Sequence, residues 1–461
     1  MIKVGYSAVK KILFGLLFSV VLGASSAFAG SSEDLAIHLT MKVTKLSNGL
    51  KVILVEDHTV PIISYQTWYR VGSVDEHPGI TGISHLFEHL MFKGTPKYGP
   101  KEFFIQLEAK GADVNAYTTR DYTVYHETFV SPLLEKVIDM ESDRMDHLKL
   151  DSEVLNSERM VVLEERKLRT DNSPDGRMQE ALWGLAYKLH PYSWPVIGDP
   201  RDLLGLSVDQ IVSYYRAHYQ PANAAVVIVG DFKTDDVIKL MKKYYSPIEE
   251  RPRPKREIPN EPEQSEERRL TLYDQVASER FTQGYHVPSA KDDDSYALDV
   301  LSNILFEGTS SRAYRRLVDE KNIVVGVSGS NFTPTYPGLF IVSGVMKGSL
   351  SSSEAEQELD RVIREVQDKG VTQEEITAAV KQLTVQAVDS VRTPDGMAQL
   401  MGTVEMIFGD PDRYADDLKK YLKVTRDDVK RVANKYMLPN NRSVVTLKPE
   451  SERATKEGAS R

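Results

Sequence analysis

The spacing of apolar residues along the chain changes between a period of two and a period near 3.6. Short runs rich in Val, Ile, Tyr and Thr predict strands at 51–55, 62–69, 123–129, 225–229, 280–287, 323–327 and 338–345. Amphipathic runs predict helices at 81–92, 100–109, 131–147, 152–169, 175–186, 208–217, 234–245, 292–306, 311–319, 351–369, 373–391, 412–421 and 426–436. The strands gather at the start and end of two stretches, with helices between them. This order predicts α+β units rather than βαβ winding.

A segment rich in proline and charge separates the two stretches. Residues 251–267 hold few large apolar side chains, which is typical of an exposed linker. We therefore divide the mature chain into an N-terminal domain at 30–250, the linker at 251–267 and a C-terminal domain at 268–450. Residues 451–461 are predicted to be a disordered tail.

The two domains resemble each other weakly. The sequence Phe92-Lys93-Gly94-Thr95 matches Phe306-Glu307-Gly308-Thr309, and Pro-Asn or Pro-Ala-Asn precedes a β-branched run near the end of each domain. Aligning the two Phe-x-Gly-Thr sequences places His85 opposite Asp299, Glu88 opposite Ser302 and His89 opposite Asn303.

The first residues predict export. Residues 1–29 hold three lysines, a short apolar core and Ala27-Phe28-Ala29, which together read as a signal peptide. The alternative is an uncleaved anchor, but the apolar run is short for spanning a bilayer. We expect no stable membrane insertion after cleavage, and a periplasmic location, with secretion as the second choice.

Composition limits the residue types that could bind a metal and the kinds of partner that the protein could bind. The 461 residues include no cysteine, so a metal site would have to use histidine and carboxylate ligands. The formal net charge of −9 becomes −12 after removal of the signal peptide. An acidic chain argues against nucleic acid as a main partner.

The most informative chemistry lies in His85-Leu86-Phe87-Glu88-His89. On a helix, positions i, i+3 and i+4 lie on one face, so both imidazoles and the carboxylate point the same way. Two neutral nitrogen ligands beside a carboxylate are what a zinc hydrolase needs. The order is that of the inverted zincin signature, although two histidines at this spacing also occur by chance.

A third ligand is expected on the helix at 152–169. Its apolar stripe, formed by Val154, Leu155, Val161 and Val162, also contains two carboxylates, Glu158 and Glu165. Burying a carboxylate is costly unless a partner or a metal compensates. We predict Glu165 as the third zinc ligand and Glu158 as a carboxylate that orients a ligand histidine. The alternative is that both acids pair with Arg or Lys.

These residues resemble the M16 (pitrilysin) family of zinc peptidases, which includes mitochondrial processing peptidase. The resemblance rests on His85-x-x-Glu88-His89 followed by Val161-Val162-Leu163-Glu164-Glu165, and on later sequences that end with Tyr219-Gln220-Pro221-Ala222-Asn223. The size is most similar to the M16B subgroup. The family implies two homologous halves, each an antiparallel-rich sheet backed by helices, closing like a clam around a chamber.

The resemblance also implies a mechanism. One Zn²⁺ per chain would be held by His85, His89 and Glu165, and Glu88 would activate a zinc-bound water to hydrolyse short or unstructured peptides. Asn115 and Ala116 lie in a sequence that is similar to the family's substrate-side strand, where they would bind the peptide backbone.

One part of the family pattern is missing. The Arg and Tyr that the family uses to bind the substrate carbonyl fall on Asp319 and Gly326, although Tyr314, Arg315 and Arg316 lie nearby. The resemblance therefore implies a catalytic subunit whose homologous partner supplies the Arg and Tyr. An inactive scaffold or a peptide-binding subunit is the alternative.

Overall fold

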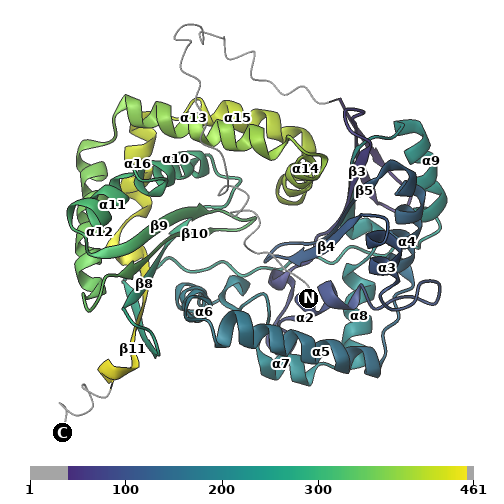
Figure 1. Ribbon diagram of the computed structural model, residues 1–461, viewed down its shortest axis with the longest axis horizontal. Helices are drawn as coiled ribbons and strands as arrows, with labels where there is room; N and C mark the ends of the chain where they lie inside the picture. The colour runs from purple at the N-terminus through teal and green to yellow at the C-terminus, as the bar shows by residue number, and fades with distance from the viewer. Residues whose placement is uncertain (1–39, 454–461) are drawn as a thin grey trace, which may run out of the picture.

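The computed structural model describes residues 40–453, which form two β-sheets with helices packed on them (Figure 1). The predicted signal peptide lies outside the described residues, as does the tail beyond residue 453; residues 450–453 form a helical turn. Within 40–453, the helices are too short or too polar to cross a lipid bilayer.

The first sheet has six strands in the order β1-β2-β6-β3-β5-β4. Neighbouring strands are antiparallel except β2 and β6, which are parallel. The strands are β1 (Met41–Lys45), β2 (Lys51–Glu56), β3 (Ile62–Tyr69), β4 (Asp113–Thr118), β5 (Thr123–Val130) and β6 (Ala224–Gly230). Strand β4 forms one edge of this sheet.

The second sheet has five strands in the order β7-β11-β8-β10-β9. It repeats the order β2-β6-β3-β5-β4 of the first sheet, and its one parallel pair, β7 and β11, takes the place of β2 and β6. The strands are β7 (Arg268–Asp274), β8 (Arg280–Val287), β9 (Val324–Phe332), β10 (Gly338–Met346) and β11 (Arg442–Pro449). The chain thus has two homologous α+β halves, as the sequence predicts.

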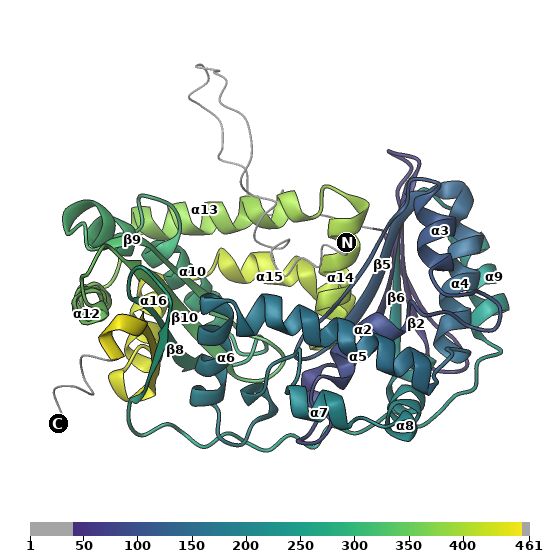
Figure 2. The same cartoon turned by 60° about the horizontal axis from the view of Figure 1, so that its bottom comes forward.

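The helices of the first half follow the predicted pattern closely. They are α2 (Ile83–Leu90), α3 (Glu102–Glu108), α4 (Leu134–Asp146), α5 (Ser152–Arg166), α6 (Pro174–Ala186), α7 (Pro200–Gly205), α8 (Val208–His218) and α9 (Thr234–Tyr245). A π-helical turn at Lys167–Asp171 extends α5. Helices α3, α4 and α9 lie on the outer side of the first sheet (Figures 1 and 2).

The second half has a similar set of helices. They are α10 (Asp294–Phe306), α11 (Arg312–Tyr314), α12 (Ser352–Lys369), α13 (Gln373–Ser390), α14 (Pro394–Phe408), α15 (Tyr414–Tyr421) and α16 (Arg426–Tyr436). The predicted helix at 311–319 is only a short α-helix followed by a π-helical turn at Arg315–Glu320.

The two halves exchange one helix each. Helix α14 of the second half packs on β3 and β6 of the first sheet, where Met401 and Ala398 meet the buried indole of Trp68 and its neighbours. Helix α6 of the first half packs in the same way on β7, β8 and β11, where Leu182 lies among Leu339 and Val445. Each sheet is therefore covered on both faces, and the apolar interior runs across the boundary between the halves.

The segment 251–267 contains no helix or strand, but it is not the freely exposed linker that its composition suggests. Arg256 forms a two-bond ion pair with Asp75 at 2.7 and 2.8 Å. Glu261 accepts hydrogen bonds from the backbone N–H groups of residues 188, 189 and 190. Gln264 donates to the carbonyl of Arg442 at 2.8 Å. The linker is thus tied to both halves.

Candidate metal centre

Helix α2 carries both histidines of the motif, and every residue of this helix is buried. Its start is held by Glu76, whose carboxylate accepts hydrogen bonds from the N–H groups of Gly82 and Ser84 at 2.7 and 2.8 Å. An acceptor is needed there because the first N–H groups of a helix have no partner within it. The role of Glu76 could not be predicted from the sequence, because a single acid in a loop has no characteristic spacing from other residues.

A close backbone contact fixes where α2 begins. A Cβ at Gly82 would lie 2.6 Å from the carbonyl oxygen of Ile197, and a Cβ at Gly198 would lie 2.4 Å from that of Thr81. Both glycines also have positive φ angles, 88° and 85°. Only glycine allows this approach.

Helix α5 brings the acids to the site. Asp151 caps its start by accepting from the N–H of Val154 at 2.9 Å. Leu155, Glu158 and Val162 are buried, and the side chain of Glu165 is 13% exposed. Glu164, its neighbour in the chain, is 60% exposed. Val161, which was predicted to be on the buried stripe, is 44% exposed, so that prediction is wrong.

The structure brings His85, His89 and Glu165 together. One donor atom from each residue lies within 4.8 Å of the other two. Glu165 Oε2 is 3.7 Å from His85 Nε2 and 3.2 Å from His89 Nε2. Among residues 40–453 these three form the single group of histidine and acidic side chains with such spacing.

Glu88 lies beside this group and is 4% exposed. Its Oε2 is 4.0 Å from His85 Nε2. Burial raises the pKa of Glu88 to about 7, although the neighbouring His89 acts in the opposite direction. A carboxyl whose pKa lies near neutrality can both accept and release a proton at physiological pH.

The pKa values of His85, His89 and Glu165 are all shifted by burial and by one another. Burial, together with the nearby His89, lowers the pKa of His85 to about 3, so its ring is neutral. Burial alone would raise the pKa of Glu165, but His89, His85 and Arg169 lower it to about 2. Burial would lower the pKa of His89, but the carboxylates of Glu165, Glu88 and Glu158 outweigh this and raise it.

Glu158 reaches the far side of the second histidine. Its Oε2 is 3.8 Å from His89 Nδ1, and its Oε1 is 2.6 Å from Lys93 Nζ. Glu165 is similarly shared, because its Oε1 is 2.8 Å from Arg169 Nη1. The alternative of pairing with Lys or Arg is therefore realised in part, but for each acid one oxygen remains directed at a histidine.

The donor set suits zinc. The buried Nε2 of His89 makes no hydrogen bond, although it points at a carboxylate. Two imidazoles and one carboxylate are a common set of three protein ligands for catalytic zinc, which leaves a fourth position open.

Asn115 and Ala116 lie on β4, which is paired with β5 on one side and is otherwise the edge of the sheet. Helix α2 contacts this strand. Asn115 Oδ1 accepts a hydrogen bond from the N–H of Ala116 at 2.9 Å. The predicted substrate-side strand is thus an edge strand next to the helix that carries the histidines.

The structure places the two residues onto which the Arg and Tyr of the family are expected to fall. Asp319 lies in the π-helical turn after α11, and Gly326 lies on β9. Of the nearby alternatives, Arg316 is held by Glu358 at 2.7 Å and by Glu320 at 3.0 Å.

The fold and this site define a class of protein, and comparison with known sequences agrees with it. Residues 51–200 match the family described as insulinase (peptidase family M16), and residues 205–383 match the peptidase M16 inactive domain. The chain belongs to peptidase family M16.

Individual relatives are zinc proteases. Over 448 residues the chain is 30% identical to zinc protease PqqE of Helicobacter pylori, which covers 96% of this chain and 99% of the relative. It is 24% identical to a sequence named as mitochondrial-processing peptidase subunit beta from Arabidopsis thaliana, over 88% of this chain and 78% of that one. A crystal structure of a protease from Helicobacter pylori superimposes with a TM-score of 0.85 at 29% identity, covering 89% of this chain and all of that one.

Proposed function

We propose that this protein is a zinc-dependent endopeptidase that hydrolyses short or unstructured peptides. His85, His89 and Glu165 would hold one Zn²⁺, and Glu88 would be the general base. The observation that carries the proposal is the convergence of three donor groups from two separate helices within 4.8 Å, with a buried carboxyl group beside them.

The bound metal would act as a Lewis acid, which makes a water molecule more acidic and polarises the peptide carbonyl. Glu88 accepts a proton from that water at its carboxylate and later gives it to the leaving amine. Glu158 lies 3.8 Å from Nδ1 of His89, where its carboxylate would orient the ring so that Nε2 is directed at the centre of the site.

Strand β4 provides a way to bind peptide. An extended peptide can add to an exposed strand edge through backbone hydrogen bonds, so the substrate would lie along Asn115 and Ala116. Because such pairing needs an extended chain, it favours unstructured substrates over folded proteins.

A homologous M16-type subunit is proposed as the partner. The support is the absence of Arg and Tyr at positions 319 and 326, where this chain has Asp and Gly. Groups that bind a developing oxyanion contribute about 3–4 kcal/mol in comparable sites, so the chain alone would be slow. We further propose that the protein acts in the periplasm after removal of residues 1–29.

The test is peptide cleavage by the mature chain, with and without the product of a neighbouring homologous gene. Glu88→Gln should lower kcat by about 10² to 10⁴-fold while zinc content stays unchanged. If the variant cleaves as fast as the wild type, Glu88 is not the base.

Zinc bound without cleavage under any condition would instead identify the chain as a peptide-binding subunit. A chain without zinc would be the inactive scaffold.

A further inference from the structure

A cavity of about 870 Å³ lies where the linker meets the two halves. The first half contributes Lys45, Lys51 and Arg70, the linker contributes residues 253–256, and the second half contributes Lys291, Tyr336 and the end of α14 at 405–409. None of the four residues of the candidate metal centre lines it. It is therefore a separate feature of the molecule.

The charge of this cavity is opposite to that of the chain. Seven Lys and Arg side chains line it against two carboxylates, whereas the whole chain carries a net charge of −9. The cations are Lys45, Lys51, Arg70, Arg253, Lys255, Arg256 and Lys291, and the carboxylates are Asp75 and Glu405. Such a local excess of one sign attracts ligands of the other sign.

Both carboxylates already form ion pairs with cations of the cavity wall. Glu405 is buried and pairs with Lys51 at 2.9 Å and with Arg70 at 2.5 Å. Arg70 and Lys51 also donate to backbone carbonyls at the end of α14. Asp75 pairs with Arg256 at 2.7 Å. These pairs hold the cavity wall together and leave no negative charge for the other cations.

Four cations remain uncompensated. Within residues 40–453, no carboxylate lies within 4.0 Å of the side-chain nitrogens of Lys45, Arg253, Lys255 or Lys291. Burial and the nearby Arg256 lower the pKa of Arg253. Lys45, Arg253, Lys255 and Lys291 are all exposed, so an anion can reach them and is attracted by their charge.

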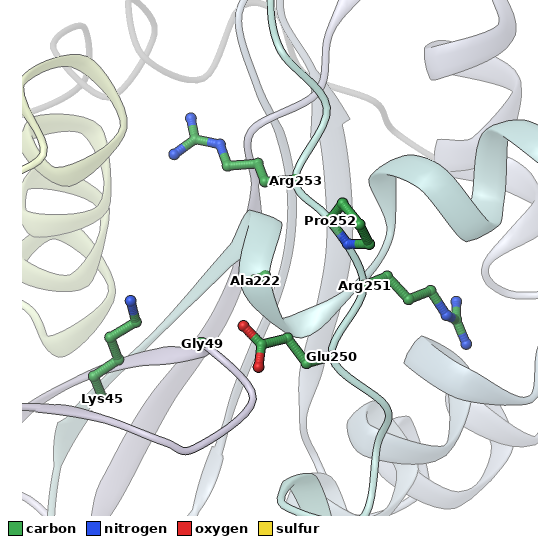
Figure 3. A pocket seen from close by; sticks show the side chains of 7 residues that line it. All are labelled: Lys45, Gly49, Ala222, Glu250, Arg251, Pro252 and Arg253. Carbon is green, nitrogen blue, oxygen red and sulfur yellow. The ribbon is translucent and has the colours of Figure 1, made fainter.

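A smaller hollow of about 510 Å³ adjoins the same place. The side chains of Lys45, Glu250 and Arg253 extend to one side of the linker, and Arg251 extends to the other (Figure 3). Arg251 is held there by Asp146 at 3.3 Å. Glu250 is thus the one further carboxylate near the mouth, so the excess of positive charge persists.

We propose that this cavity binds a small multivalent anion of the phosphate class, such as an oligophosphate or a phosphorylated metabolite. Guanidinium and ammonium groups together suit phosphate oxygens, because arginine donates in a fork and lysine acts as a point charge. The volume falls in the usual range for small-molecule sites and exceeds what a single phosphate needs. Tyr336 and Phe408 add aromatic surface for a larger ligand.

The ligand would join the two halves. Its cationic partners come from the first half, the linker and the second half, so the anion would bind the assembled junction and not the unfolded chain. A ligand that binds only the native state stabilises it by RT ln(1 + L/Kd), where L is the free ligand concentration, so the melting temperature rises with the logarithm of ligand concentration above Kd.

The experiment is a titration of the full mature chain with sodium tripolyphosphate at constant ionic strength, followed by calorimetry and by the melting temperature. We expect saturable binding and a rise in Tm, with sodium chloride giving neither. The double variant Arg253→Gln/Lys255→Gln should bind at least about tenfold more weakly. Lys110→Gln/Lys381→Gln removes the same charge from exposed sites elsewhere and should bind like the wild type.

Neither Arg253 nor Lys255 makes an ion pair, so the variant should fold. If it does not fold, the double variant Lys45→Gln/Lys291→Gln removes two cations that the first and second halves contribute to the cavity, and its tripolyphosphate binding is measured instead. Chelation of metal by tripolyphosphate would affect the variant and the control equally, so a difference between them reports the cavity.

Absence of saturable binding, or equal binding by the variant and the control, overturns the proposal. A pentaglutamate peptide that binds where tripolyphosphate does not would also overturn it, because the site would then recognise an acidic peptide.

Discussion

Glu158 is a buried carboxylate whose environment explains its burial. It lies between His89 and Lys93, so one oxygen faces the imidazole of His89 and the other faces an ammonium group. A carboxylate in this position fixes the orientation of the imidazole and raises its basicity. Its effect is therefore on metal affinity more than on the fold.

Glu158→Gln is expected to weaken zinc binding by about 10 to 100-fold, because the amide holds His89 less strongly. Competition with a chromophoric chelator measures this directly. Glu153→Gln, on the exposed side of the same helix, is the control and should leave zinc affinity unchanged. Equal affinities for the two variants would contradict the orienting role.

Asp299 occupies, in the second half, the position that aligns with His85. It is partly buried and accepts hydrogen bonds from Asn331 Nδ2 at 2.9 Å and from the Tyr421 hydroxyl at 2.6 Å. Burial raises its pKa to about 6 from an ordinary value of 3.8, although the two hydrogen bonds act in the opposite direction. The second half thus has a hydrogen-bonded acid where the first half has a histidine.

This shift of the Asp299 pKa predicts that the free energy of unfolding depends on pH. The folded state holds the proton more tightly than the unfolded state, so stability falls as pH rises from about 4 to 6 and stays lower above that. The loss is on the order of 3 kcal/mol. Asp299→Asn should remove it, so the variant should be more stable than the wild type at pH 7.5 but not at pH 4.

Urea unfolding at the two pH values checks the prediction, with exposed Asp293→Asn as the control. A stability difference between Asp299→Asn and the wild type that does not change with pH would contradict it.

At the residue scale the sequence predicted which donor side chains come together better than it predicted which side chains are buried. His85, His89 and Glu165 do meet, because helical spacing determines which side chains share a face. Val161 shows the limit of that argument, since periodicity locates a face only to within about a residue. Glu76 and Lys93 contact the site through tertiary structure, which no local pattern reveals.

At the scale of elements, the exchange of α6 and α14 is what joins the halves. Both helices begin with nearly the same sequence, Ser173-Pro174-Asp175-Gly176 and Thr393-Pro394-Asp395-Gly396, and in both the hydroxyl of the first residue caps the helix. A Cβ at Gly176 would lie 2.1 Å from the carbonyl oxygen of Arg169. A Cβ at Gly396 would lie 1.8 Å from that of Ser390. This repeat was available in the sequence, and it would have predicted α14.

Gly402 tests the packing of α14 on the first sheet. A Cβ there would lie 2.0 Å from the ring of Trp68, which is fully buried. Gly402→Ala is expected to destabilise the protein by about 1–3 kcal/mol, as overpacking of a core does. Thermal unfolding measures the change.

Gly184 on α6 is the matched control, because a Cβ there meets no atom closer than 3.7 Å. Gly184→Ala should be neutral or slightly stabilising, since alanine favours a helix by about 1 kcal/mol over glycine. Loss of stability in Gly184→Ala but not in Gly402→Ala would contradict the packing described.

Two physical reasons explain why β1, β7 and α14 were not predicted. Strands β1 and β7 lie at the edges of their sheets and are only partly buried, so their residues lack a strong apolar pattern. Helix α14 contains Gly396 and Gly402, which read as helix breakers although both serve close contacts. The other helices of ten or more residues were predicted to within three residues at each end.

At the scale of the whole molecule, the two halves share one fold, and among residues 40–453 only the first half has a group of possible metal ligands. The strand order of the second sheet repeats that of the first, yet the acid and amide at Asp299 and Asn303 replace the two histidines. Weak internal similarity predicted this repeat. The exchange of helices could not be predicted, because it depends on which sheet face each helix covers.

The central claim is that two helices of the first half build a zinc site from distant residues. Glu164 and Glu165 are neighbours with opposite surroundings: the side chain of Glu165 faces the histidines, and that of Glu164 is 60% exposed. Zinc content of Glu165→Gln and Glu164→Gln, measured by mass spectrometry after dialysis against a weak chelator, separates them. We predict that Glu165→Gln loses its zinc and that Glu164→Gln keeps one ion per chain; full zinc retention by Glu165→Gln would contradict the account.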